Sequence, residues 1–222
     1  MRGRFITFEG GEGTGKSTQV ALLAKRLRAL AVSVVVTREP GGSPGAEIIR
    51  HVVLSGAAKP LGAEAEALLF AAARADHVTN TVRPALERGQ WVICDRFVDS
   101  TRVYQGVLGN VDLRIISALE RLATGNTMPD LTIILDVPTR LGLERAASRR
   151  GASAADRFET ETLNFHVKLR KAYKELAKSH PGRCVLIDAR GPKEAVAEQI
   201  WTVVNRRLEP ATAPLMLEDV EP

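Results

Sequence analysis

Apolar residues along the chain gather in five short runs, which alternate with segments of helical spacing. The runs are apolar throughout, as is typical of strands that are covered on both faces. Because helix-like segments separate them, the pattern predicts an α/β fold: a five-stranded parallel sheet, flanked by helices on both faces and joined by right-handed crossovers. The predicted strands are Phe5–Glu9, Val32–Thr37, Trp91–Asp95, Leu131–Val137 and Cys184–Asp188.

The segments between and after the strands carry apolar residues three and four positions apart, which indicates helices. Residues 63–88 form one predicted helix, which Pro84 kinks or ends. Other helices are predicted for residues 112–123, for residues 140–150, for the segment that carries His166, Leu169, Tyr173 and Leu176 on one face, and from Lys193 to Leu208. We therefore expect a single domain over residues 1–208. Residues 209–222 contain three prolines and no periodic pattern, so a disordered tail is expected there.

The composition is that of a globular protein, with 222 residues, 45% hydrophobic and 26% charged. No apolar run approaches the roughly 20 residues that cross a bilayer, so no membrane partner is expected. Cys94 and Cys184 each lie in an apolar run, which indicates buried free thiols and a reducing, cytoplasmic location. The net charge of +5 is compatible with a nucleic-acid binder. However, the basic residues are spread along the chain, and a few phosphate-binding arginines explain the same excess.

The segment Gly10–Ser17 has the spacing G-x-x-x-x-G-K-[ST] of a phosphate-binding loop, or P-loop. It follows a predicted strand and precedes a predicted helix, which is the context that the motif requires. Glycines let backbone N–H groups surround phosphate oxygens, and the helix N-terminus adds positive potential. Lys16 is expected to reach the β- and γ-phosphates, and the Ser17 hydroxyl to ligate Mg²⁺. The alternative is a glycine-rich turn with a chance lysine.

Charged residues gather where the predicted strands end, at the edge where ligands of such sheets bind. Glu9 and Asp95 are candidates for organising Mg²⁺, although a carboxylate at a strand end can also cap a loop. Arginines at this edge predict a second phosphate-bearing substrate, because a guanidinium binds phosphate oxygens bidentately. Solvated surface charge is the alternative. These arginines are Arg38, Arg50, Arg74 and Arg96.

A basic pair, Arg149-Arg150, adjoins a stretch of small residues at 151–155, with Arg145 and Arg157 nearby. We expect a short helical lid over about residues 145–157 that delivers an arginine to the transferring phosphoryl group. A solvated helix end is the alternative.

These motifs, in this order, resemble those of thymidylate kinases, which are P-loop nucleoside monophosphate kinases. The resemblance covers roughly residues 3–208. It implies the reaction ATP + dTMP ⇌ ADP + dTDP with Mg²⁺, as part of dTTP synthesis, and a homodimer. It rests on Phe8-Glu9-Gly10 through Thr18, Thr37-Arg38-Glu39-Pro40-Gly41-Gly42, Leu68, Phe70, Ala73 and Arg74, Asp95-Arg96-Phe97, Tyr104-Gln105-Gly106, Leu135-Asp136-Val137 and Ile187-Asp188-Ala189.

The resemblance also implies a role for each matching residue. Phe70 would stack on the thymine ring, Arg74 would hydrogen-bond the base, and Tyr104 would lie against the sugar and favour deoxyribose. The implied dTMP-binding residues are Glu9, Arg38, Glu39, Pro40, Arg50, Phe70, Arg74, Arg96, Ser100, Thr101, Tyr104 and Gln105. The implied ATP-binding residues are Gly10, Gly11, Glu12, Gly13, Thr14, Gly15, Lys16, Ser17, Thr18 and Asp188. Catalytic roles fall to Lys16, Asp95, Arg96, Arg149 and Arg150, and metal-binding roles to Ser17, Glu9 and Asp95.

Glu12 lies in the loop where one branch of this family carries its catalytic arginine. The chain therefore resembles the bacterial type, in which the lid supplies it, here from Arg149 or Arg150. The acceptor phosphate has a pKa near 6 and is largely dianionic at pH 7, so no general base is expected. Two alternatives are a kinase for UMP or CMP and a nucleic-acid-binding P-loop protein. The helical surfaces at 63–75 and 112–122 could form a dimer interface or belong to the core.

Overall fold

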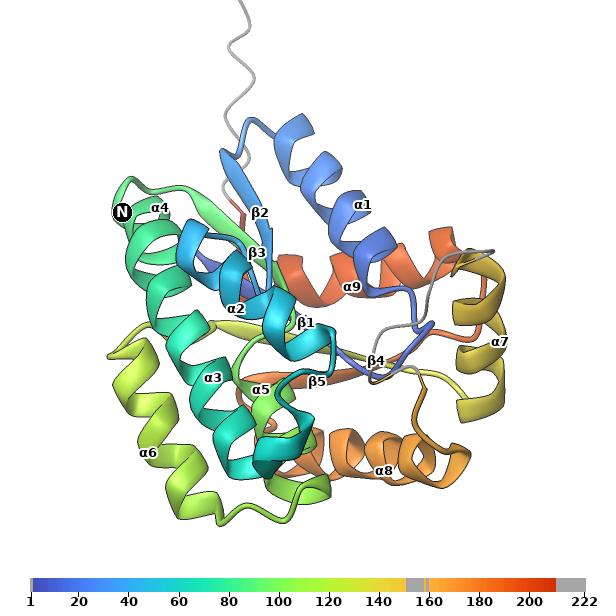
Figure 1. Ribbon diagram of the computed structural model, residues 1–222. Helices are drawn as coiled ribbons and strands as arrows, with labels where there is room; N and C mark the ends of the chain where they lie inside the picture. The colour runs from blue at the N-terminus through green and yellow to red at the C-terminus, as the bar shows by residue number, and fades with distance from the viewer. Residues whose placement is uncertain (1, 151–157, 159, 211–222) are drawn as a thin grey trace, which may run out of the picture.

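In its computed structural model the chain forms a sheet of five parallel strands, which confirms the predicted α/β fold (Figure 1). The structure describes residues 2–150, 158 and 160–210. Across the sheet the order is β2-β3-β1-β4-β5, so the strand that leads into the P-loop lies in the centre. The strands are β1 (Phe5–Glu9), β2 (Val34–Arg38), β3 (Trp91–Asp95), β4 (Leu131–Asp136) and β5 (Cys184–Asp188).

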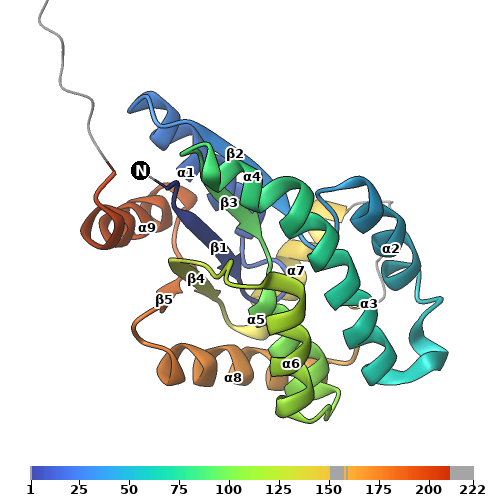
Figure 2. The same cartoon turned by 90° about the vertical axis from the view of Figure 1, so that its left-hand side faces the viewer.

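Helices cover both faces of the sheet (Figures 1 and 2). On one face lie α1 (Lys16–Ala29) and α9 (Lys193–Leu208), and on the other α4 (Arg83–Glu87), α5 (Val98–Thr101) and α8 (Leu163–Ser179). Beside this second face stand α2 (Pro44–Leu54), α3 (Gly62–His77) and α6 (Leu113–Thr124), whereas α7 (Thr139–Arg150) packs against the P-loop. Shorter turns are a 3-10 helix at Lys59–Leu61 and π-helical segments at Val78–Val82 and Arg102–Leu108.

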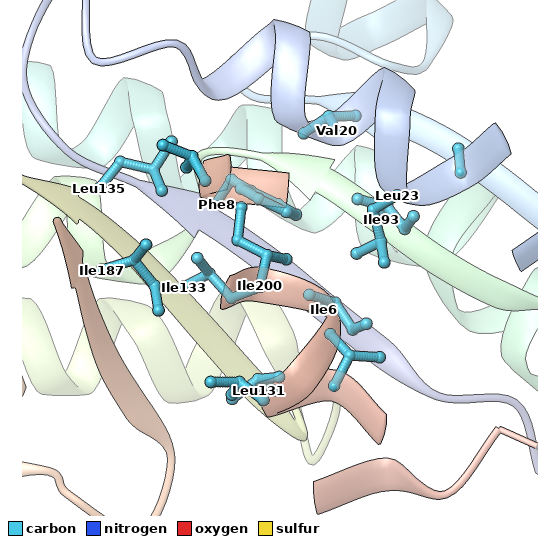
Figure 3. Packing of buried hydrophobic residues seen from close by; sticks show 14 of the residues in the cluster. Ile6, Phe8, Val20, Leu23, Ile93, Leu131, Ile133, Leu135, Ile187 and Ile200 are labelled. Carbon is cyan, nitrogen blue, oxygen red and sulfur yellow. The ribbon is translucent and has the colours of Figure 1, made fainter. Parts of the chain in front are cut away.

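The main hydrophobic core lies between the sheet and the α1–α9 face (Figure 3). Ile6 and Phe8 of β1 and Ile133 of β4 are fully buried there, packed with Leu23 of α1 and Ile200 of α9. The continuous apolar runs of β1 and β4 reflect burial on both faces, as predicted. The edge strands β2 and β5 depart from that prediction, since Val36 is 43% exposed and Leu186 is 38% exposed. Each edge strand has a neighbour on one side only, so helices cover it incompletely.

The predicted helix over residues 63–88 is a composite of α3, a π-helical segment and α4. Pro84 lies in the first turn of α4, directly after the π-helical segment Val78–Val82. Proline has no N–H to donate, and its ring clashes with a regular helical turn. The wider π turn accommodates it, so the helix continues to Glu87 instead of ending at Pro84.

Helix α2 is an element that the sequence patterns above do not predict. It begins at Pro44, after Ser43 in an extended N-cap conformation, and proline is favoured in a first helical turn. Ala46 and Val53 are buried, whereas Ile48 and Val52 are 71% and 38% exposed, so the apolar residues do not all lie on one buried face. Most of the predicted lid, at residues 151–157, lies outside the described residues, as do residues 211–222 of the predicted tail. Over the part of the chain that is described, no helix has the length and apolarity to traverse a membrane.

Candidate active site

The P-loop joins β1 to α1 and is built around glycines in the left-handed region. Gly13 has a φ of +66°, and a Cβ there would collide with the carbonyl oxygen of Gly142 in α7. The Lys16 ammonium donates to the Gly10 and Gly11 carbonyl oxygens at 3.1 and 2.8 Å, so it lies under the loop. Burial lowers the pKa of Lys16, since desolvation disfavours the charged form. The Lys16 ammonium is therefore held within the loop that follows β1.

The carboxylate at the end of β3 lies directly beside the start of α1. Strands β1 and β3 are neighbours, so their carboxyl ends meet. Ser17 Oγ donates to Asp95 Oδ2 at 2.7 Å. Hydroxyl and carboxylate oxygens are the donors that Mg²⁺ prefers, so this pair fits the ion that was predicted here. Within the described residues, no group of three or more His, Cys, Asp or Glu side chains could hold a metal without further ligands.

A cavity of about 320 Å³ opens beside the P-loop and brings most of the predicted site together. Volumes of this size are typical of small-molecule sites. Its lining includes predicted residues from five separate parts of the chain: Glu12, Gly13, Gly15, Lys16, Ser17, Thr18, Arg38, Glu39, Pro40, Arg50, Phe70, Arg74, Asp95, Arg96, Ser100, Thr101, Tyr104, Gln105 and Arg149. It also includes Leu54, Phe97 and Phe158, which the sequence reasoning missed. A single apolar residue in a helix or loop carries no signal of a ligand.

Arg96 projects into this cavity from an unusual backbone conformation. Its φ is +69°, a region that residues with side chains rarely adopt. The Arg96 guanidinium donates to Glu12 Oε1 at 2.7 Å and lies 5.3 Å from the centre of the Tyr104 ring. Burial alone would raise the pKa of Glu12, but the charges of Arg96 and Lys16 outweigh it and lower that pKa. Glu12 thus stays ionised and holds Arg96 between the P-loop and the Tyr104 ring.

Glu9 lies beneath the cavity wall and does not line it. It is fully buried and accepts four hydrogen bonds, from the Phe97 and Ser100 backbone N–H groups and the Ser100 and Tyr173 hydroxyls, at 2.7 to 3.2 Å. Burial, followed by the charge of Asp99, raises the Glu9 pKa to about 7. Direct binding of dTMP or Mg²⁺ by Glu9 would require giving up these bonds, so this arrangement does not support the two predicted contacts. A strand-end carboxylate that caps a loop, the alternative noted for such residues, fits the geometry.

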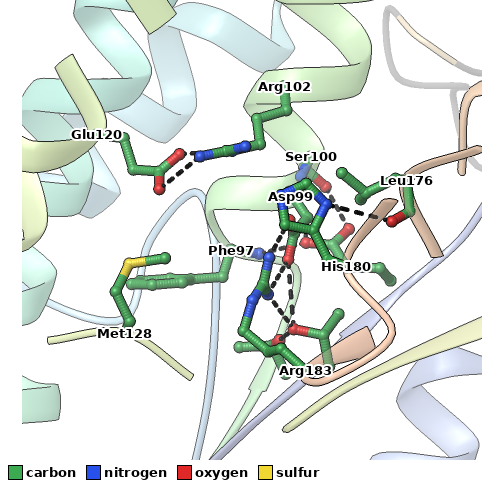
Figure 4. Close-up of polar contacts among 12 residues, drawn as sticks. Phe97, Asp99, Ser100, Arg102, Glu120, Met128, Leu176, His180 and Arg183 are labelled. Carbon is green, nitrogen blue, oxygen red and sulfur yellow. Dashed lines mark hydrogen bonds and ion pairs between the residues drawn. The ribbon is translucent and has the colours of Figure 1, made fainter. Parts of the chain in front are cut away.

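Two further ion pairs anchor the same helical segment, which consists of α5 and the π-helical turns that follow it (Figure 4). Asp99 is fully buried and receives two bonds from Arg183, at 2.5 and 2.8 Å. Arg102, three residues further on, forms a bidentate ion pair with Glu120 of α6 at 2.7 and 3.0 Å. Residues 97–108, which carry Ser100, Thr101, Tyr104 and Gln105, are thereby joined to α6 and to Arg183, the residue before β5. Partners this far apart in the sequence leave no local pattern, so neither pair was predicted.

The residues predicted to contact the base and the acceptor phosphate all line this cavity. Arg74 is buried, one helical turn after the half-buried Phe70. Arg38 pairs with Glu47 at 2.9 Å and remains half exposed. Arg50 donates to the Pro40 carbonyl oxygen at 2.6 Å. An aromatic ring and several guanidinium groups in one cavity suit a ligand with a flat ring and an anionic group.

Of the predicted lid, the structure describes the end of α7. Arg149 is exposed and lines the cavity, whereas the side chain of Arg150 lies outside the described residues. Arg145 donates to the Ala189 and Arg190 carbonyl oxygens, both at 2.9 Å, which joins α7 to the end of β5. Asp188 lies at that strand end, away from the cavity, and its bonds from Arg190 lower its pKa to about 2.

Comparisons with known proteins agree on one family. The sequence model of the family described as "Thymidylate kinase" matches residues 8–200. Among curated proteins, a thymidylate kinase of Nitrobacter winogradskyi is 62% identical over 213 residues, which are 96% of this chain and 93% of that protein. One of Bradyrhizobium diazoefficiens is 60% identical, with 96% and 93% covered. Among solved structures, a thymidylate kinase from Ehrlichia chaffeensis has a TM-score of 0.73 at 32% identity, with 92% of this chain and 99% of that one covered.

Proposed function

The chain belongs to the thymidylate kinase family and phosphorylates dTMP, and we propose that ATP with Mg²⁺ is the donor and that the cavity beside the P-loop holds dTMP. One observation carries this proposal. Groups suited to two separate phosphates line a single cavity: Lys16 with the P-loop, and the three arginines Arg38, Arg50 and Arg96. The two phosphates would meet between Lys16 and Arg96.

The acceptor dTMP would lie with its base between Phe70 and Arg74 and its phosphate near Arg38 and Arg96. Phe70 offers a flat ring for stacking, and Arg74 offers donors to a base carbonyl. The buried Tyr104 ring would pack against the sugar, where it leaves no room for a 2′-hydroxyl. These roles explain why one cavity combines aromatic residues with arginines.

Phosphoryl transfer joins an oxygen of the dTMP phosphate to the γ-phosphorus of ATP and breaks the bond from that phosphorus to the ADP oxygen. The attacking phosphate is already dianionic, so no side chain has to remove a proton. The difficulty is the repulsion between two anions. Lys16 and Arg96 offset that repulsion and align the reacting groups.

Ser17 and Asp95 are the residues that would hold the metal, either directly or through a water molecule. The oxygen donors and their contact at 2.7 Å fit Mg²⁺. When bound, the ion neutralises charge on the phosphate oxygens. Glu9 would act indirectly, through the backbone of Phe97 and Ser100 that it holds.

Arg149 is the proposed lid arginine, because it lines the cavity and its charge contributes to lowering the Glu12 pKa. The Arg149→Ala variant is expected to lower kcat by about 100-fold or more with little change in the KM for dTMP, since an arginine of this kind acts on the transferring group. Arg150→Ala is the matched comparison. The opposite ranking of the two variants would assign the role to Arg150.

The central test removes the P-loop ammonium. The Lys16→Ala variant should lose about 100-fold or more of dTMP-dependent ADP release, because a preorganised charge on the phosphates is gone. Lys25→Ala is the control, since Lys25 is an exposed lysine of the same helix. Thermal unfolding of both variants checks that the fold is intact. Near-normal turnover of a folded Lys16→Ala protein would contradict the proposed role of the loop.

A homodimer is the proposed assembly, supported by apolar side chains that face outward on neighbouring helices. Leu68 of α3 is 57% exposed, and Ile115 and Leu122 of α6 are 44% and 82% exposed. The two helices lie side by side (Figure 2). A second copy would bury this surface. Light scattering should give twice the 24.1 kDa chain mass, and Leu68→Glu with Leu122→Glu should give the monomer.

A cytoplasmic location is also proposed, because Cys94 and Cys184 are both buried free thiols, as expected for a protein of a reducing compartment.

A further inference from the structure

We propose that His77, which does not line the cavity, is a positioning residue that sets the selectivity of the acceptor site for bases with a carbonyl at C4. It would do so by holding Glu39, which in turn holds Arg74. This inference rests on the proposed placement of the dTMP base between Phe70 and Arg74.

Hydrogen bonds fix the orientation of the Arg74 guanidinium. It is 3% exposed, and two of its three nitrogens have partners. Nε donates to Glu39 Oε2 at 2.8 Å, and Nη2 donates to the Phe97 carbonyl oxygen and to Thr101 Oγ1, both at 3.1 Å. No described residue accepts a hydrogen bond from Nη1. The guanidinium is therefore held through Nε and Nη2, and Nη1 is the nitrogen that can donate to a ligand.

A guanidinium donates hydrogen bonds and cannot accept them. A base with a carbonyl at C4, such as thymine, can accept from Nη1. A base with an amino group at C4, such as cytosine, would place its own N–H groups against those of Arg74. The discrimination holds only while the guanidinium keeps its orientation, because a free arginine could turn away from the amino group.

His77 in turn holds the Glu39 carboxylate. Its other oxygen, Oε1, lies 3.0 Å from Nδ1 of His77. A carboxylate only accepts, so Nδ1 carries the proton. On the far side of the ring, Nε2 lies 2.7 Å from Thr37 Oγ1. Thr37, His77, Glu39 and Arg74 thus form one chain of contacts from β2 to the cavity.

The His77 ring is closely packed on all sides. Its side chain is completely buried, one turn after Arg74 on the same face of α3. Gly42 closes over the ring with a φ of +85°, and a Cβ there would collide with Thr37 Oγ1 and lie 2.6 Å from His77 Nε2. A ring held in this way cannot follow Glu39 if that side chain moves. It fixes the carboxylate from behind, and through it the base-facing arginine.

The experiment compares dTMP and dCMP as acceptors by steady-state ADP release. For His77→Leu, which removes the donor to Glu39, we expect the KM for dTMP to rise about 10-fold, kcat to stay within about 3-fold, and the preference for dTMP over dCMP to fall about 10-fold. His77→Asn is the conservative variant, since its amide lies where Nδ1 lies. It should restore most of the preference. His51→Leu, at an exposed histidine of α2, is the control.

His77→Gln covers the case in which His77→Leu does not fold. Its amide reaches toward Thr37, where Nε2 lies, and leaves Glu39 without a donor, so it should lose the same preference. Wild-type selectivity in folded His77→Leu or His77→Gln would overturn the inference, as would an equal loss of kcat on both substrates. A wild-type protein that does not phosphorylate dTMP would contradict the proposed function instead.

Discussion

The buried Asp99–Arg183 pair allows the sharpest prediction on stability. The Asp99 side chain is completely buried, and the Arg183 side chain is 18% exposed. In Asp99→Asn one oxygen that accepts from Arg183 becomes an NH₂ group, and the Arg183 charge loses its counter-charge. The volume stays the same, so packing around β4 and β5 is preserved.

The magnitude follows from burial. Removing one partner of a buried ion pair costs about 3–5 kcal/mol, and the residual exposure of Arg183 places the cost at the lower end. The charge of Asp99 also contributes to raising the Glu9 pKa, so its removal relieves some repulsion. A net loss of about 2–3 kcal/mol in the free energy of unfolding remains. For a chain of this length that corresponds to a Tm lowered by roughly 4–12 °C.

Thermal unfolding followed by circular dichroism measures this change. The matched control is Asp112→Asn, which breaks a bidentate pair with Arg114 at a similar distance, 2.6 Å. That pair is exposed, and asparagine retains the N-cap of α6, so its Tm should change by less than about 2 °C. A similarly small change for Asp99→Asn would refute the argument that burial of the pair makes it costly to break.

Three further predictions concern the site. The Glu9 pKa is raised from its ordinary value of 4.5 to about 7, so the protonated side chain contributes its full stability below pH 4.5 and loses it as the pH rises through 7. Relative to Glu9→Gln, the wild-type free energy of unfolding should therefore fall by up to about 3 kcal/mol between pH 4.5 and pH 7. Parallel pH profiles of the two proteins would contradict this prediction. Gly13→Ala should lower both the Tm and the affinity for ATP, measured by calorimetry, because the added Cβ meets Gly142 and the φ is positive. Phe70→Ala should raise the KM for dTMP by about 10-fold or more through lost stacking, and an unchanged KM would place the base elsewhere.

Local patterns were sufficient wherever one stretch of chain carries the whole signal. The P-loop needs only its own glycines, lysine and flanking apolar runs, so the motif at Gly10–Ser17 predicted a loop between β1 and α1. Five apolar runs predicted the five strands. Helix α2 was not predicted, because it buries Ala46 and Val53 but leaves the apolar Ile48 and Val52 exposed. The edge strands are more exposed than their apolar sequences indicate.

The candidate site could be predicted only in part from local sequence patterns. Charged residues at strand ends predicted a ligand edge, and the resemblance to thymidylate kinases supplied individual roles. The sequence could not show that Glu9 turns away from the cavity to cap the Phe97–Ser100 backbone. Nor could it pair Glu39 with His77, 38 positions apart, or Asp99 with Arg183, 84 positions apart.

The fold, the phosphate loop and the residue types at the ligand edge can therefore be predicted from local sequence, because periodicity and short motifs involve neighbours in the chain. Which of those residues line the cavity, and which hold the others in place, depends on how the elements pack. A buried charge must find its partner wherever packing brings one within about 3 Å, and that distance is set by the assembled sheet and helices.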